Sequence, residues 1–226
     1  MSLNRKLMKL DKKSLVMGIY VVLVIIIGRF LLVQSGITPE VVRLGYAIAF
    51  FGLIPRLLIK KGFKENFESY NWPETRYFKK QMIFSIVVAV LSFVALWIGV
   101  IGIWLNGFDN VLVWKNWGMI KIFILTLTVF PMGLFLQEFF LRGFLLNGWR
   151  KSFGDWRAVL AVALVAVLFA VIQKGAWDWF LVLGVFVLNI ILSWMVIRLR
   201  SFVFSFLVYW LILIMSVFWL IWRFSG

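Results

Sequence analysis

The residues of this chain whose types and spacing could do chemistry lie in residues 130–150, where Glu138 and Arg142 interrupt an otherwise apolar segment. An ionisable pair at membrane depth costs free energy, so these residues are candidates for a functional site. On a helix they are four positions apart with the acid nearer the N-terminus, so their side chains share a face in the order that favours a charge pair. A structural ion pair is the alternative explanation for their presence.

The composition places these residues in a membrane protein. Of 226 residues, 64% are hydrophobic and 15% are charged, whereas globular domains are nearer about half apolar and about a quarter charged. Several apolar runs approach the roughly 20 residues that a helix needs to cross a bilayer. We therefore expect an all-α polytopic transmembrane bundle of about seven crossings, at residues 15–33, 41–59, 81–105, 118–146, 158–172, 179–197 and 202–222.

Lys and Arg are distributed unevenly between the two sides of this bundle. Seventeen lie in the N-terminal tail and in the segments expected on the same side, and five lie in the opposite segments. The positive-inside rule then predicts a cytoplasmic N-terminus. These residues flank the apolar runs instead of forming one long patch, so we expect membrane lipids, and no nucleic acid, as their partners.

The domain organisation is expected to be simple. Residues 1–80 form a two-helix region with a basic cytoplasmic loop, and residues 81–226 form the helical core. The loop at residues 60–80 mixes lysines with aromatic residues such as Phe63 and Tyr70. It is interpreted either as a connector whose aromatic rings lie at headgroup depth or as a docking surface for a partner.

The residue inventory limits the possible chemistry. The chain contains no Cys and no His, which removes disulfides, thiolate nucleophiles, the commonest general base and the commonest metal ligand. We accordingly expect no metal and no cofactor.

One segment resembles a known family. Residues 137–143, QEFFLRG, look like the first signature of the CAAX protease and bacteriocin-processing family (CPBP, or Abi), written E-E-x-x-x-R-G. Glu138 and Arg142 match the second glutamate and the arginine, and Gln137 stands at the first glutamate. Residues 169–173 are similar to the second signature, F-x-x-x-H, with Gln173 at the histidine.

The third signature of that family is a histidine followed four residues later by an asparagine. It falls at Tyr209 and Leu213, after a short basic turn. The resemblance covers about residues 118–222. With a rise of about 1.5 Å per residue, Glu138, Gln173 and Tyr209 all fall at middle depths of their helices, as one shared site requires.

The resemblance implies an intramembrane protease in which glutamates and histidines activate a water molecule or hold a metal that does so. Here glutamine cannot take a proton, and tyrosine is a poor base at neutral pH. We therefore favour a non-catalytic pseudoprotease that acts as a scaffold or binding partner for another membrane protein, a peptide or a lipid-linked chain. The alternatives are an active CPBP endopeptidase, of CAAX type or processing leader peptides, that uses Glu138, and a small transporter in which the buried pair is a coupling site.

The other polar residues within the spans have structural explanations. Gln173 follows Ala163, Ala166 and Ala170 on one helical face, a pattern that favours close helix packing and an interhelical hydrogen bond. Asn189 is interpreted in the same way. The resemblance and the absence of a eukaryotic targeting signal favour a prokaryotic plasma (inner) membrane, with another membrane or envelope protein as partner.

Overall fold

Within the residues that the structure describes, the chain is helical and contains no strand. The structure is a computed structural model that describes residues 12–34, 39–66, 70, 79, 81–91, 94, 124, 127–174 and 179–224. The all-α class is confirmed. Helices long and apolar enough to cross a membrane are Lys12–Phe30, Val129–Phe153, Asp155–Ile172 and Val182–Leu199, and shorter apolar helices are Gln81–Leu91 and Val203–Met215. The number of crossings and the orientation of the N-terminus stay predictions.

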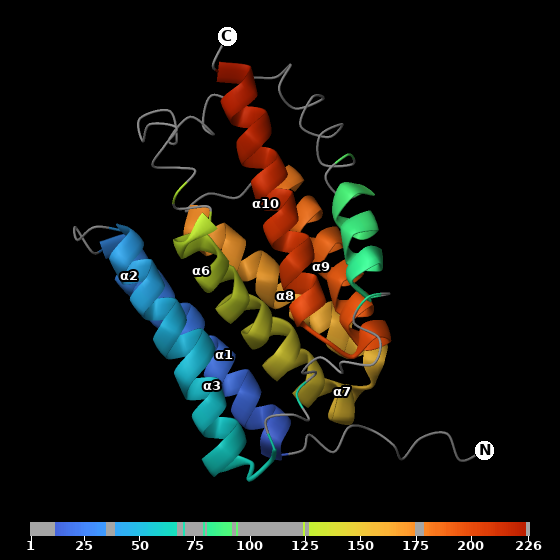
Figure 1. Ribbon diagram of the computed structural model, residues 1–226. Coiled ribbons are helices and arrows are strands. Elements are labelled where there is room, and N and C mark those ends of the chain that lie inside the picture. Colours follow the sequence, from blue (N-terminus) through green and yellow to red (C-terminus); the bar gives the residue numbers. More distant parts are fainter. Residues whose placement is uncertain are drawn as a thin grey trace.

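The N-terminal region consists of two helices that lie side by side (Figure 1). The first is α1 (Lys12–Gln34). The second runs without a break through α2 (Pro39–Tyr46), the π-helical turns of η1 (Ala47–Leu53), α3 (Ile54–Leu57) and η2 (Leu58–Gly62). The expected crossing at residues 41–59 lies inside this second helix.

Two tyrosines join these helices in opposite directions. Tyr20 of α1 donates a hydrogen bond from its hydroxyl to the carbonyl of Phe50, and Tyr46 donates to the carbonyl of Val24 at 2.5 Å. A buried phenol needs such a partner. A Cβ atom at Gly28 would lie 2.6 Å from the Tyr46 hydroxyl oxygen, so glycine at this position lets the ring reach α1.

The helix that carries the first signature is continuous from Val129 to Phe153. It comprises α6 (Val129–Glu138), the π-helical η6 (Phe139–Leu146) and α7 (Asn147–Phe153). Pro131 falls in the first turn of α6, where a missing N–H group breaks no intrahelical hydrogen bond. The expected crossing at 118–146 overlaps this helix, although residues 118–123, 125 and 126 lie outside the described part.

The C-terminal helices are α8 (Asp155–Lys174), α9 (Trp179–Leu199) and α10 (Val203–Phe224). Antiparallel α8 and α9 pack closely, and the rings of Trp156 and Trp194 have centroids 5.9 Å apart. Figure 1 shows α6 between the N-terminal helices on one side and α8, α9 and α10 on the other. The signature-bearing helix is therefore the centre of the bundle.

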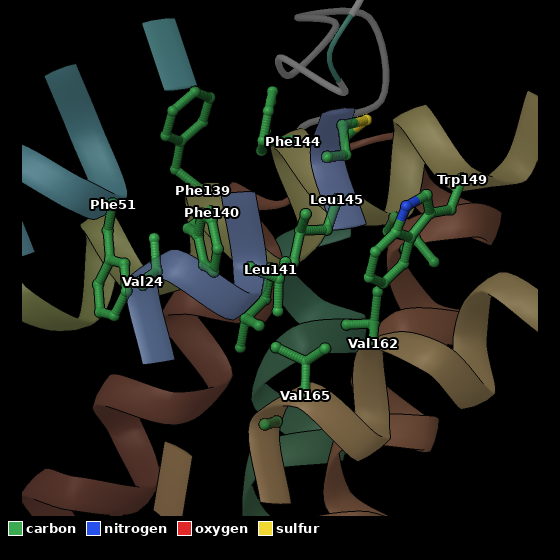
Figure 2. Packing of buried hydrophobic residues seen from close by; sticks show 14 of the residues in the cluster. Val24, Phe51, Phe139, Phe140, Leu141, Phe144, Leu145, Trp149, Val162 and Val165 are labelled. Carbon is green, nitrogen blue, oxygen red and sulfur yellow. The ribbon is translucent and has the colours of Figure 1, made fainter. Parts of the chain in front are cut away.

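The core is built around η6, in which all residues from Phe139 to Leu146 are buried. Figure 2 shows η6 side chains lying among residues of α1, η1 and α8. The rings of Phe51 and Phe140 stack with centroids 5.0 Å apart, and Phe169 meets Phe51 edge-on at 5.4 Å. Such aromatic pairs add about 0.5–1.5 kcal/mol each beyond the area they bury. Phe169, the phenylalanine of the second signature, thus ties α8 to the helix pair across the core.

The outer surfaces of the helices are apolar. On α1 the exposed side chains are Leu15, Val16, Ile19, Val22, Leu23, Ile26 and Phe30. Exposed faces of this kind are costly in water and neutral in lipid. The chain is a multi-pass membrane protein whose helices present such faces to the bilayer.

The segment after η2 packs against the bundle. Lys13 donates hydrogen bonds to Glu65 Oε2 at 2.5 Å and to the Tyr70 hydroxyl at 2.8 Å. Tyr70 is 1% exposed, and its ring stacks on Phe144 with centroids 6.5 Å apart. Neither the connector nor the docking-surface interpretation of the loop at residues 60–80 predicted that Tyr70 is buried. Residues 67–69, 71–78 and 80 of this loop lie outside the described part.

Two helices end in strained residues. Lys64 follows η2 with φ 54°, and Arg200 follows α9 with φ 52°. The left-handed conformation costs a non-glycine residue about 1–2 kcal/mol, and helices usually place glycine there. A cation near a helix C-terminus contributes about 0.3–1 kcal/mol. The attraction to the helix end therefore offsets only part of the strain.

Candidate functional site

The ion pair expected from the sequence forms at the junction of α6 and η6. Arg142 donates a hydrogen bond from Nη1 to Glu138 Oε1. The side chain of Glu138 is 1% exposed and that of Arg142 is fully buried. A buried pair is stable only when further hydrogen bonds replace the water that both groups have lost. The surrounding helices supply these bonds.

The first additional hydrogen bond to the buried pair comes from α9. Arg142 donates a second hydrogen bond, from Nη2, to Asn189 Oδ1 at 2.5 Å. The other end of the amide donates from Nδ2 to the carbonyl of Val185 at 2.7 Å. The prediction that Asn189 makes an interhelical hydrogen bond is confirmed. Its partner is a charged side chain, so this bond is stronger than one between neutral groups.

The second additional hydrogen bond to the buried pair comes from α10. The hydroxyl of Ser205 lies 2.5 Å from Glu138 Oε2 and 2.7 Å from the carbonyl of Phe202. Its single proton can be donated to only one of these acceptors at a time. Ser205 was not predicted from the sequence. The available signal was its position four residues before Tyr209, which puts two polar side chains on one face of an apolar helix.

Tyr209 joins the same group of residues. Its side chain shares a hydrogen bond with Asn189, and it feels the charges of Arg142 and Glu138. The position that resembles the family's histidine therefore meets the first signature, as the depth argument required. We call Glu138, Arg142, Asn189, Ser205 and Tyr209 the Glu138 network.

The remaining signature positions have different surroundings. Gln137 is half-buried on α6 and stands outside the Glu138 network, and Leu213 is half-buried on α10 one turn beyond Tyr209. Gln173 belongs to the last turn of α8, but its side chain lies outside the described part of the structure. The contribution expected from Gln173 stays a prediction.

The glycine of the first signature has a packing role. A Cβ atom at Gly143 would lie 2.8 Å from Phe139 Cδ2 and 3.4 Å from Phe202 Cδ1. Distances below about 3.0 Å do not occur for real Cβ atoms, so a side chain here would displace the ring of Phe139 on the same helix. Gly143 thereby leaves room for the Phe139 ring, which packs against Phe202 with centroids 5.6 Å apart.

The geometry of the Glu138 network favours a fixed charge over an acid or base. Arg142 and Ser205 each engage one carboxylate oxygen of Glu138. A general base must reach the proton that it abstracts, and four members of the network are buried side chains with 1% exposure or less. Among the described residues, no three acidic, histidine or cysteine side chains cluster as metal ligands would.

The comparisons with known proteins agree with the signatures. Residues 117–215 match the family described as type II CAAX prenyl endopeptidase Rce1-like, close to the expected range of 118–222. No curated protein and no solved structure matches the chain. The matched residues contain α6 to α9 and most of the described part of α10, so they include every member of the Glu138 network. Residues 117–215, somewhat less than half of the chain, are therefore similar to the Rce1-like membrane proteins of the CPBP family.

Proposed function

We propose that this protein is a non-catalytic member of the CPBP family, a pseudoprotease that acts as a scaffold or binding partner in the membrane. The observation that carries the proposal is the state of Glu138. Arg142 neutralises its charge and Ser205 occupies its second oxygen, inside a buried network. A carboxylate held in this way stabilises helix packing, and with 1% exposure it is shielded from a substrate.

The replaced signature positions support the same conclusion. Peptide hydrolysis needs one group that activates water and another that protonates the leaving amine. In the family, by resemblance, these tasks fall to glutamates and histidines, whereas this chain has Gln137, Gln173 and Tyr209 at three of those positions. Glutamine does not titrate, and the phenol of tyrosine, with an ordinary pKa of about 10, is a poor base at neutral pH. No histidine elsewhere in the chain can take over the role.

What the fold retains supports the proposed binding role. The central helix, the aromatic core and the apolar outer faces are those of a packed membrane bundle. Such a bundle can hold another membrane protein, a peptide or a lipid-linked chain through its lateral helix faces without any chemistry. We infer a prokaryotic plasma membrane as its setting and another membrane or envelope protein as its partner.

The experiment is extraction of the intact membrane protein in mild detergent, followed by mass spectrometry of the molecules that remain bound. The proposal predicts a partner at stoichiometric ratio whose association survives Glu138→Gln. A bulky side chain at Ala170, half-buried on α8, should weaken the association by moving helices. Cleavage of a bound peptide that stops with Glu138→Gln would instead identify an endopeptidase.

A further inference from the structure

One end of the bundle carries a cluster of basic residues outside the Glu138 network. This basic end comprises the start of α1, the end of η2, α7, the start of α8 and the turn between α9 and α10. Contacts hold these segments at one level: Ser14 Oγ donates to Ser152 Oγ at 2.6 Å, and Trp156 meets Trp194. Figure 1 shows the start of α1, the end of η2 and α7 together at the bottom of the view.

The acidic residues described at this end are already engaged. Glu65 pairs with Lys13 at 2.5 Å and with Lys151 at 3.5 Å, and Asp155 pairs with Arg150 at 2.8 Å. The described residues of this end include ten basic ones, against two acidic ones, Glu65 and Asp155: Lys12, Lys13, Lys60, Lys61, Lys64, Arg150, Lys151, Arg157, Arg198 and Arg200. Of the basic residues at this end, those that are exposed and outside these ion pairs are Lys12, Lys60, Lys61, Lys64, Arg157, Arg198 and Arg200.

Two of these residues hold their positions at a conformational cost. Lys64 and Arg200 are the non-glycine residues with positive φ within the described ranges, and both are exposed directly after a helix. Glycine would satisfy the backbone at either position without strain. The chain carries a long cationic side chain at both, which indicates that the side chain has a use of its own.

We propose that the basic end binds the anionic headgroups of membrane lipids, with Lys64 and Arg200 as contact residues. Lys64 follows the second N-terminal helix and Arg200 follows α9, and Figure 1 shows these two helices on opposite sides of the central helix. Cations spread around the rim of a bundle match the surrounding lipid surface better than one compact acidic ligand. The asymmetry of Lys and Arg assigns this end to the cytoplasmic leaflet, where anionic lipids attract basic residues.

The experiment measures thermal unfolding of the full chain in nanodiscs of phosphatidylcholine, with and without phosphatidylglycerol. Phosphatidylglycerol should raise the unfolding temperature of the natural protein, and added salt should reduce this rise. Lys64→Gly and Arg200→Gly should each be more stable than the natural protein in pure phosphatidylcholine, by about 2–4 °C. Each should nevertheless show a smaller rise with phosphatidylglycerol.

Two controls separate charge from other effects. Lys64→Arg retains the cation and should retain the rise, whereas Arg29→Gln, on the exposed surface of α1 away from the basic end, should leave it unchanged. The proposal is overturned if the glycine variants keep the full rise or if the natural protein shows none. An equal rise from soluble polyglutamate in pure phosphatidylcholine would also overturn it, in favour of an acidic protein partner.

Discussion

Arg142 and Asn189 are 47 positions apart in the chain, and the guanidinium Nη2 donates to the amide Oδ1 at 2.5 Å. This bond connects the central helix to α9, and the same guanidinium reaches Glu138. Glu138 in turn meets Ser205 of α10. One buried cation therefore links the signature of the family to two further helices.

Removing the amide should destabilise the protein. Asn189→Ala takes away the acceptor of Arg142 and leaves the guanidinium with one hydrogen-bond partner fewer in a buried site. We expect a loss of about 1–2 kcal/mol in the free energy of unfolding. The measurement is denaturant or thermal unfolding in detergent, with Ile191→Ala on the exposed side of the same helix as the control. An Asn189→Ala protein as stable as this control would contradict the role of the bond.

The two members of the ion pair should respond differently to substitution. Arg142→Ala leaves a buried carboxylate without its cation, which costs about 3–5 kcal/mol when a buried pair is broken from one side. Glu138→Gln keeps a hydrogen-bond acceptor for Arg142 and should cost less. Yield and unfolding temperature of the two variants test the order. Small and equal effects would show that water reaches the site and that the charges are not sealed in the core.

Two glycines of α1 provide a matched pair. Gly28→Ala places a Cβ atom 2.6 Å from the Tyr46 hydroxyl oxygen, whereas a Cβ atom at Gly18 has no neighbour within 4 Å. Gly28→Ala should lower stability by about 1–3 kcal/mol, since Tyr46 must leave its buried acceptor. Gly18→Ala should raise stability by about 0.5–1 kcal/mol through helix propensity. Parallel unfolding of both variants checks the prediction, and a shared direction of change would refute the contact.

The ion pairs of Glu65 predict a dependence of stability on pH. Burial by itself raises the pKa of Glu65. Hydrogen bonds from Lys13 and Tyr70, together with the positive charges of Lys13 and Lys151, lower the pKa by more than burial raises it, so the pKa lies below its ordinary value. A carboxyl group whose pKa is lowered by folding stabilises the folded state at pH values above its unfolded pKa, which is about 4.3 for glutamate. This contribution is lost as the pH falls through the lower, folded pKa.

Glu65→Gln should therefore be less stable than the natural protein at pH 7, and the difference should shrink as the pH falls below about 4. Unfolding temperatures of both proteins across that range measure it. Asp155→Gln, which removes a more exposed pair, should show a smaller difference at pH 7. A gap between Glu65→Gln and the natural protein that stays constant down to pH 3 would show that the carboxylate charge is not the cause.

The sequence predicted some members of the Glu138 network and missed another. The four-residue spacing identified the pair of Glu138 and Arg142, and the register of the third signature identified Tyr209. Ser205 was missed because a serine in an apolar helix usually bonds its own backbone. Its contact with Glu138 depends on how closely α10 approaches the central helix, which tertiary packing decides.

The fold was predictable to a similar extent. Apolar runs are sufficient to place helices in a membrane protein, and the helical class is confirmed. The π-helical turns of η1 and η6 have no sequence signal of their own, because they adjust the helix to its neighbours. The burial of Tyr70 likewise results from Lys13 and Glu65, which lie far apart in the sequence and meet only in the folded bundle.

The most direct measurement of the central claim is a cleavage assay of the purified protein with prenylated and leader-peptide substrates, beside the Glu138→Gln variant. The absence of histidine and cysteine and the engagement of Glu138 by Arg142 and Ser205 predict no cleavage by either protein. Cleavage by the natural protein that persists through stringent repurification and disappears in Glu138→Gln would contradict the non-catalytic account.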